Sequence, residues 1–357
     1  MKLTRTSSRK KEHVELVISK DVAFKGKTTG FERWDFVHNA LPEFNFADVD
    51  TTSTFLGKKI ALPLIISSMT GGYGDAERIN RQLAEVCGEK QLAMGVGSQR
   101  QVLENETYIQ SYRAAREAAP EIPLIGNLGA AEVAKLESVT PILRLAEMIR
   151  ADGFAIHLNP LQEFLQPEGS TEFHHVLTNI EMLVRELALP VIVKEIGAGI
   201  SMSVATRLLN AGVTIIDIAG AGGTSWAGVE ILRRTGHTTK HRNGAGEKNS
   251  YVQEFWDWGI PTVDALRQVC SLKQQHKELT IIASGGITCG ITMAKSIAFG
   301  ADLTASARPM LKALEAKGKK GLIEVIHNYE MGLRGAMFLT GSRTIQDLQH
   351  QQLVLKG

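Results

Sequence analysis

The segment HLNPLQE, which runs from His157 to Glu163, combines one imidazole, two carboxamides and one carboxylate directly after a short apolar run. An imidazole can transfer protons, a carboxylate can bind a divalent cation, and carboxamides can orient a polar ligand. No serine or cysteine stands beside the histidine as a nucleophile. The segment therefore indicates a site that holds a substrate or a metal ion rather than one that forms a covalent intermediate.

Eight short apolar runs, rich in Ile, Val, Leu and Ala, recur along the chain, and most are separated by stretches whose apolar residues have helical spacing. Such runs are typical of parallel strands buried on both faces. The runs span residues 63–69, 92–98, 122–128, 153–159, 190–196, 213–220, 279–285 and 301–307. Eight strand-plus-helix units in series predict an α/β fold, a (β/α)8 TIM barrel, rather than two doubly wound halves.

Two regions do not follow this repeat. Residues 1–60 form an N-terminal extension that holds a basic segment and then an aromatic one, FERWDFVHNALPEFNF, which is too aromatic for disorder. We expect the extension to fold over one end of a barrel that spans 61–357. The sixth and seventh runs are about 60 residues apart, which predicts a long insertion at about 223–278, a loop or extra helices serving as a lid or partner surface.

The amino-acid composition limits the kinds of partner that the protein can bind. The 357 residues include 40 basic and 38 acidic ones, a net charge of +2 that draws the protein neither to nucleic acid nor to a membrane. No apolar run approaches the roughly 18 residues of a membrane span, and the N-terminus lacks the apolar core of a signal peptide. The three cysteines lie far apart and form no CxxC pair. We expect a cytoplasmic protein that binds any anion at a local site.

In a barrel of this kind, the chemistry lies at the C-terminal ends of the strands. The residues at these positions include Ser68, Met69, Thr70, Ser98, Arg100, Asn127, His157, Asn159, Gln162, Glu163, Lys194, Thr224, Gly285, Gly286, Ile287, Ala307 and Arg308. Amides and hydroxyls outnumber strong acids and bases among them. Singly, each neutral residue could be an ordinary turn or cap residue. Together they favour a heterocycle with many donors and acceptors, and FMN fits this description.

Two features support a flavin phosphate site. The turn ASGGIT is followed about 20 residues later by SARP, so Gly285, Gly286 and Arg308 follow the last two strands, where barrels often bind phosphate. A tight turn without a ligand is the alternative. Lys194 lies in an otherwise apolar strand, where its ammonium needs an anion. Its side chain either pairs with Glu195 or extends out of the barrel mouth, or it stabilises the reduced form of a flavin.

The N-terminal cations allow two interpretations. Arg9, Lys10 and Lys11 precede His13 and form either a solvated, disordered tail or a flexible arm that closes over a diphosphate. His237 and His241 have the i, i+4 spacing of metal ligands, but no Glu follows His237 and the surrounding sequence is poorly helical, so a zinc site is not favoured.

The ordered motifs resemble those of one enzyme family. RKKEH at 9–13, MTGG at 69–72, GSQR at 97–100, HLNPLQE, VKEIGAGIS at 193–201, GGTSW at 222–226 and SGGI at 284–287 are similar to those of the type 2 isopentenyl diphosphate isomerases, flavoenzymes with an FMN-binding barrel. The motifs span nearly the whole chain, and their order makes the resemblance specific. One departure is visible, because relatives often carry an arginine after GGI whereas Thr288 follows here.

The resemblance implies a role for each matching residue. Arg9 and Lys10 would hold the substrate diphosphate, with Arg100, His157 and Asn159 also facing the substrate. Gln162 would lie next to its double bond, and Glu163 would bind a Mg²⁺ ion that bridges to the diphosphate. The FMN would be lined by Ser68, Met69, Thr70, Ser98, Asn127, Lys194, Thr224, Gly285, Gly286, Ile287, Ala307 and Arg308. The resemblance also implies a homotetramer or homooctamer and NADPH as the reductant of FMN.

The implied reaction converts isopentenyl diphosphate into dimethylallyl diphosphate. Protonating an unactivated alkene needs a strong acid, whereas Gln162 has no useful proton and His157 is only a modest acid. The resemblance supplies reduced FMN as the acid and base, with Gln162 and His157 as the candidate catalytic side chains.

Three alternatives remain. A 2-hydroxy-acid oxidase or dehydrogenase needs a histidine base and an arginine clamp after a late strand, and SGGIT offers neither. An inosine-monophosphate-dehydrogenase-like enzyme needs a nucleophilic cysteine after the sixth strand, where residues 220–250 contain none. A non-catalytic flavin-binding barrel is the third.

Overall fold

A computed structural model describes residues 5–236 and 250–356 of the chain. Its centre is a closed barrel of eight parallel strands in the order β10-β11-β4-β5-β6-β7-β8-β9. The strands are β4 (Leu64–Ile66), β5 (Ala93–Gly95), β6 (Leu124–Gly129), β7 (Gly153–His157), β8 (Val191–Lys194), β9 (Ile215–Asp217), β10 (Thr280–Ala283) and β11 (Leu303–Ser306). Seven lie within the apolar runs and β6 extends one residue beyond its run, to Gly129, so the predicted (β/α)8 barrel is confirmed.

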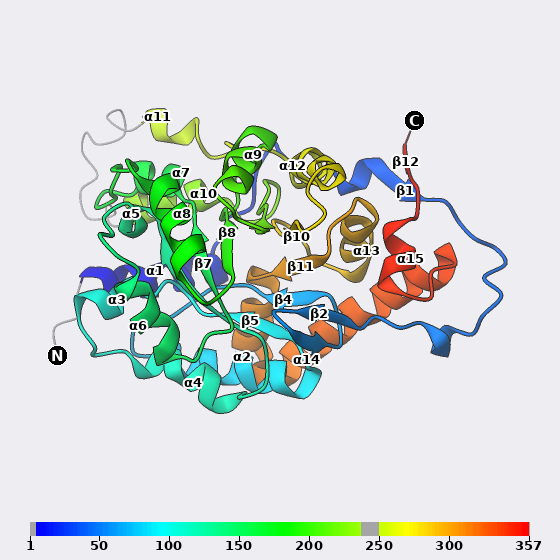
Figure 1. The fold of residues 1–357 in the computed structure, drawn as a ribbon, viewed down its shortest axis with the longest axis horizontal. Helices are drawn as coiled ribbons and strands as arrows, with labels where there is room; N and C mark the ends of the chain where they lie inside the picture. Colours follow the sequence, from blue (N-terminus) through cyan, green and yellow to red (C-terminus); the bar gives the residue numbers. More distant parts are fainter. Residues whose placement is uncertain (1–4, 237–249, 357) are drawn as a thin grey trace.

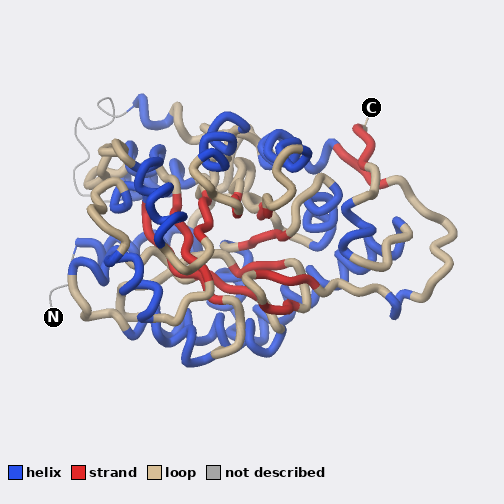
Figure 2. The backbone as a smooth tube through the Cα atoms, in the orientation of Figure 1, coloured by secondary structure: helices blue, strands red, loops and turns tan. Residues whose placement is uncertain are grey.

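Helices surround the barrel, as the tube view in Figure 2 shows. Those in the first half are α2 (Ala76–Lys90), α3 (Arg100–Glu104), α4 (Gln110–Ala118), α5 (Ala130–Val133), α6 (Thr140–Met148), α7 (Pro160–Leu165) and α8 (Val176–Glu186). Those in the second half are α9 (Met202–Asn210), α10 (Trp226–Gly236), α11 (Ser250–Gln253), α12 (Thr262–Cys270), 3-10 helix η3 (Ser271–Gln274), α13 (Gly290–Ala298), α14 (Arg308–Thr340) and α15 (Ile345–Gln349). Between the sixth and seventh barrel strands lie α10, α11, α12 and η3, in the region where the sequence predicts extra helices.

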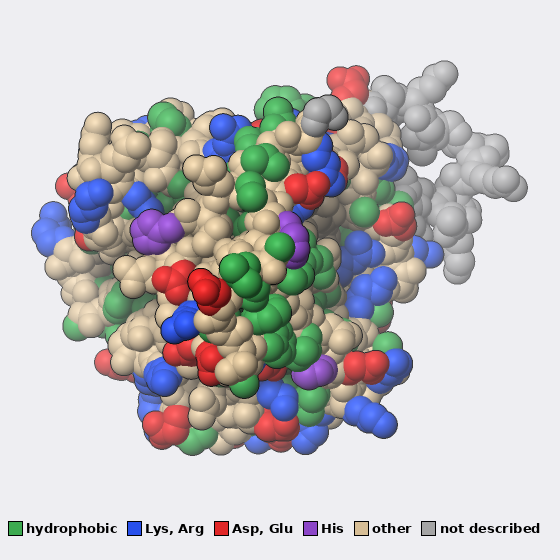
Figure 3. Space-filling view, turned by 90° about the vertical axis from the view of Figure 1, so that its right-hand side faces the viewer, with side chains coloured by type: hydrophobic (Ala, Val, Ile, Leu, Met, Phe, Trp, Pro, Cys, Tyr) green, Lys and Arg blue, Asp and Glu red, His purple; other side chains and the backbone are tan. Residues whose placement is uncertain are grey.

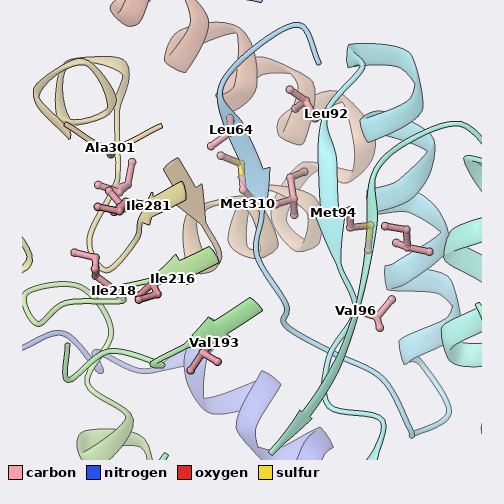
Figure 4. Close-up of a cluster of buried hydrophobic side chains, with 14 of the residues drawn as sticks. Leu64, Leu92, Met94, Val96, Val193, Ile216, Ile218, Ile281, Ala301 and Met310 are labelled. Carbon is pink, nitrogen blue, oxygen red and sulfur yellow. The ribbon is translucent and has the colours of Figure 1, made fainter. Parts of the chain in front are cut away.

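The strands form because alternate apolar residues pack on opposite faces of the sheet. Ile65, Ile192 and Ile282 point into the barrel and fill its centre. Leu64 and Ile216 belong to the outer layer, which packs against the helices and is drawn in Figure 4. A strand that is buried on both faces has no solvated side, so a charged residue at its end is held by the protein itself.

Residues 5–19 form a helix rather than a solvated tail, so that interpretation is wrong. Helix α1 (Arg5–Ser19) lies across the barrel mouth and contacts α10 and α14 (Figure 1). The segments that follow are η1 (Phe31–Arg33), η2 (Phe46–Asp48), β1 (Trp34–Phe36), β2 (Ser53–Phe55) and β3 (Lys58–Ile60). Strand β1 pairs with the C-terminal β12 (Leu353–Leu355), and Phe55 and Ile60 of the β2–β3 hairpin join the apolar layer inside the barrel.

One end of the molecule carries exposed apolar side chains. Val37, Leu41, Val354 and Leu355 are exposed near the β1–β12 pair. Figure 3 views this end of the molecule and shows hydrophobic side chains gathered at its centre among charged ones. Within the described parts of the chain, no helix is long and apolar enough to cross a membrane.

Candidate active site

Two adjoining cavities open at the C-terminal ends of the strands, beneath α1. The smaller has a volume of about 130 Å³ and the larger about 570 Å³. Ser68, Met69 and Lys194 line both cavities and form part of the wall that they share. The larger volume lies within the range of about 300–1,000 Å³ that is usual for small-molecule and cofactor sites.

The predicted site residues divide between these two cavities. Besides the shared residues, the smaller is lined by Arg9, Lys10, Thr70, Ser98, Arg100, Asn127, His157, Asn159, Gln162 and Glu163. The larger is lined by Thr224, Gly285, Gly286, Ile287, Ala307 and Arg308. Residues implied to bind substrate therefore lie in one cavity, and most of those implied to bind FMN lie in or next to the other.

Glycine forms one end of the larger cavity, where the loops after β9 and β10 meet. Gly285 has a φ of +91°, and a Cβ atom there would lie 2.0 Å from the carbonyl oxygen of Gly220. Gly222 has a φ of +114°, and a Cβ atom there would lie 2.2 Å from the backbone nitrogen of Thr29. Only glycine fits such positions, and the exposed backbone suits an anionic group. The residues present therefore fit a flavin phosphate.

Arg308 has a second set of contacts that the sequence did not indicate. Its Nε donates to the Val17 carbonyl at 3.0 Å, and its Nη2 donates to the Lys20 carbonyl at 2.8 Å. These carbonyls lie at the C-terminal end of α1. Arg308 therefore lines the larger cavity and also binds the C-terminal end of α1 at the rim of that cavity.

Lys194 does not pair with the Glu195 carboxylate, so that interpretation is wrong. Its Nζ donates to the backbone carbonyl of Glu195 at 2.6 Å and lies 3.9 Å from Oδ2 of Asp217. The Glu195 carboxylate accepts hydrogen bonds from the backbone N–H groups of Ile196 and Gly197, each at 2.6 Å. The anion that faces Lys194 is thus Asp217, at the end of β9.

His157 is held neutral at the end of β7. Its Nδ1 lies 2.7 Å from Oδ1 of Asn127, so Nδ1 carries the proton and donates to the amide oxygen. Burial, followed by the positive charges of Lys194, Lys10 and Arg9, lowers the pKa of His157 to about 3. His157 is therefore not even the modest acid that the sequence predicts, and its ring is neutral.

The rest of the HLNPLQE segment forms the start of α7. Nδ2 of Asn159 donates to Oε1 of Gln162 at 3.2 Å and to Oε1 of Glu163 at 3.1 Å. Oε2 of Glu163 accepts a hydrogen bond from the backbone of Ser170 at 2.7 Å. Among the described residues, Oδ1 of Asn159 and Oγ1 of Thr70 are buried without a hydrogen-bond partner, which indicates that a ligand completes this cavity.

Glu230, on α10, is a buried residue of this site that the sequence analysis missed. Its Oε1 accepts a hydrogen bond from Nε2 of Gln162 at 3.2 Å and lies 2.8 Å from Nε2 of His13. Burial alone would raise the pKa of Glu230, but His13, Gln162 and Arg233 together hold it below the ordinary value. The signal in the sequence was a lone acid within the apolar stretch of WAGVEIL.

Cations crowd the outer end of the smaller cavity. Lys10 donates to the hydroxyl of Tyr112 at 2.8 Å and to the carbonyl of Ser98. Burial, followed by the charge of Arg9, lowers the pKa of Lys10 to about 7. Burial, followed by Arg100, also lowers the pKa of Arg9. Such a set of destabilised cations is suited to a multiply charged anion such as a diphosphate.

No cluster of three or more His, Cys, Asp or Glu side chains suitable for a metal ion occurs in the part of the chain that the structure describes. A Mg²⁺ ion that bridges to a phosphate needs only one or two carboxylates, because waters and phosphate oxygens supply the other ligands. Glu163 could fill that role. His237 and His241 lie outside the described residues.

Similarity to known proteins defines the class first. The FMN-dependent dehydrogenase family matches residues 155–355. A flavocytochrome b2 variant superposes with a TM-score of 0.69 at 16% identity, covering 96% of this chain and 83% of that one. A mandelate oxidase variant solved with (S)-mandelic acid superposes with a TM-score of 0.64 at 15% identity, and the match covers 97% of this chain and 94% of that one. Identities this low show the shared fold alone, and the class is that of the FMN-dependent barrels.

Sequence relatives then define the particular family. The chain is 46% identical to an isopentenyl-diphosphate delta-isomerase from Pelodictyon phaeoclathratiforme, covering 99% of this chain and 98% of the relative. It is 48% identical to the isomerase of Chlorobium luteolum, and that match covers 97% of this chain and 95% of the relative. It is 42% identical to the isomerase of Pseudescherichia vulneris, covering 99% of this chain and 98% of the relative. The chain belongs to the isopentenyl-diphosphate delta-isomerase family, and the resemblance inferred from its motifs is confirmed.

Proposed function

We propose that this protein interconverts isopentenyl diphosphate and dimethylallyl diphosphate in isoprenoid biosynthesis, with FMN as its cofactor. The observation that supports this most strongly is the shared wall of the two cavities. The smaller cavity carries cations for a diphosphate and neutral groups near Gln162, and it adjoins a larger cavity that fits a flavin. The FMN-dependent family match supports the cofactor assignment.

The protein's own side chains bind and orient the substrate in this proposal. Arg9, Lys10 and Arg100 hold the diphosphate. His157 and Asn159 form hydrogen bonds to the substrate or to its bound water. Gln162 is held by Glu230 and Asn159, so its amide has a fixed orientation beside the hydrocarbon.

The one group that these side chains lack is a strong acid. His157 is neutral, and Gln162 is an amide that neither gains nor loses a proton readily. When bound, reduced FMN would supply the proton donor and the negative charge that stabilises a cationic transition state. Glu230, ionised and hydrogen-bonded to Gln162, is a carboxylate that could accept a proton on that side of the site.

Four further assignments complete the proposal. Glu163 binds Mg²⁺, NADPH reduces the FMN without net consumption in each turnover, and the protein acts in the cytoplasm. It also assembles as a homotetramer or homooctamer, and the exposed apolar residues at the β1–β12 end support contact between copies. The domain division at residue 60 and the insertion at 223–278 belong to the same proposal.

A 2-hydroxy-acid oxidase is the alternative that the structural neighbours raise. That reaction needs a histidine base and an arginine clamp together. The turn from Gly285 to Thr288 holds neither, and His157 donates its Nδ1 proton to Asn127. The geometry therefore favours the isomerase.

Glu163→Gln tests the proposed metal site. The amide keeps an acceptor for the backbone of Ser170 but removes the negative charge, so we expect Mg²⁺ affinity to fall at least about 10-fold and most of the activity to be lost. The measurement is the initial rate of dimethylallyl diphosphate formation against Mg²⁺ concentration. Glu172→Gln, at an exposed position nearby, is the control and should match the wild type. A fully active Glu163→Gln protein with unchanged Mg²⁺ dependence would remove Glu163 from this role.

A further inference from the structure

A pair of buried opposite charges lies at the inner end of the two cavities. Lys194 at the end of β8 is directly opposite Asp217 at the end of β9 in the strand register. Their side chains are 11% and 5% exposed, and Nζ lies 3.9 Å from Oδ2. Both face the barrel interior above the apolar layer of Ile192 and Ile282. Both residues are buried, so each charge is stabilised mainly by its protein partners.

Asp217 is fixed in place by neighbours on two elements. Its Oδ1 accepts a hydrogen bond from the hydroxyl of Ser284, at the end of β10, and another from the backbone N–H of Ala219 at 3.2 Å. Its other oxygen, Oδ2, is the one that faces Lys194. The hydrogen bonds therefore orient one carboxylate oxygen toward the ammonium.

Among the described residues, Lys194 forms no ion pair with any carboxylate other than Asp217. The Glu195 carboxylate is occupied by three consecutive backbone N–H groups, those of Ile196, Gly197 and Ala198. His157, opposite Lys194 on β7, is neutral. Burial raises the pKa of Asp217 above its ordinary value, and Lys194 and the Ser284 hydroxyl limit that rise.

We propose that Asp217 is a positioning residue that holds the Lys194 ammonium at the cavity wall, so that Lys194 can stabilise negative charge on the reduced cofactor ring. The inference rests on the proposed function, because it requires the larger cavity to bind FMN. Without Asp217, the buried ammonium loses its only ion-pair partner among the described residues, and its position at the cavity wall is no longer fixed. The ring then loses the cation that favours its anionic form.

The test is the midpoint potential of bound FMN, measured spectroscopically at pH 7.5 against a reference dye. Asp217→Asn should lower the ratio of reduced to oxidised flavin at a fixed potential by about 10-fold, which corresponds to about 30 mV for a two-electron couple. Lys194→Met should lower the ratio of reduced to oxidised flavin by at least the same factor. In the Lys194→Met protein, the additional Asp217→Asn substitution should not change the midpoint potential further, because the ammonium that Asp217 positions is already absent.

A matched control is available at the opposite end of the barrel. Asp302 pairs with Lys273 at 2.6 Å, far from both cavities, and Asp302→Asn should leave the potential unchanged. If Asp217→Asn does not fold, Ser284→Ala keeps the charge but removes the hydroxyl that orients it, and should lower the potential in the same direction by a smaller amount.

Two results separate this inference from the proposed function. A potential that is unchanged or raised in Asp217→Asn, or in Ser284→Ala where only that variant folds, would overturn the role of Asp217 while leaving the isomerase intact. A wild-type protein that binds no FMN would instead overturn the proposed function.

Discussion

Lys10 lies in the wall of the smaller cavity, beside Arg9, and its ammonium has little access to water. Its lowered pKa, about 7, means that the side chain is largely neutral in the free protein at pH 8.5. A bound diphosphate favours the charged form and raises the pKa again. Substrate binding at pH 8.5 is therefore coupled to proton uptake, whereas at pH 6 the lysine is already protonated before binding.

We predict the uptake of close to one proton per diphosphate bound at pH 8.5 and almost none at pH 6. Calorimetric titration in two buffers with different ionisation enthalpies measures this number directly. Lys10→Met should abolish the uptake and weaken binding, while Lys11→Met, at an exposed neighbouring position, should change neither. Equal uptake by the wild type and Lys10→Met would show that another group takes the proton.

Individual site residues could be predicted from sequence where they lie in short motifs at strand ends. HLNPLQE and SGGI are of this kind, and their residues line the two cavities. Glu230 and Asp217 could not be found in this way. Each is a lone acid within an apolar element, and the partners that make it part of the site are distant in sequence. His13 is 217 residues from Glu230.

At the scale of elements, Arg233 joins three separate segments. From α10 its guanidinium contacts Glu12 on α1 at 2.8 Å, Glu168 after α7, and Glu230 one turn earlier at 3.2 Å. The side chain is 12% exposed, so these ion pairs are poorly screened by water. Arg233 thus connects α1 to the segment that carries Gln162 and Glu163.

Arg233→Met should leave buried carboxylates without their cation and reduce the free energy of unfolding by about 3–5 kcal/mol. It should also increase proteolytic cleavage within α1. Chemical denaturation and limited proteolysis measure the two effects. The control is Arg185→Met, which removes an exposed pair with Glu186 and should leave the free energy of unfolding close to that of the wild type. Equal stability of the two variants would show that the Arg233 network does not hold α1.

The elements were predictable to different degrees. The eight strands were clear because an apolar run buried on both faces is a local property of the sequence. Helix α1 was not, because its sequence is strongly polar and its placement depends on Arg233 and Arg308, which lie more than 200 residues away. A tail is the better expectation from such a sequence alone, and tertiary contacts decide otherwise.

At the scale of the whole molecule, the fold does not determine the reaction. Mandelate oxidase and flavocytochrome b2 variants share the barrel at 15–16% identity. At its strand ends this chain places several cations around the smaller cavity, and it has no histidine–arginine pair on the turn after β10. A common barrel can therefore serve oxidation in one family and double-bond migration in another.

The most direct test of the central claim compares the two redox states of the flavin in one protein preparation. Purified protein is loaded with FMN, reduced anaerobically with NADPH, and incubated with Mg²⁺ and isopentenyl diphosphate. We predict that dimethylallyl diphosphate forms while the flavin stays reduced, that the oxidised protein gives no product, and that lactate or glycolate leaves the oxidised flavin unchanged. Reduction of the flavin by a 2-hydroxy acid, or no isomerisation by the reduced protein, would contradict the account.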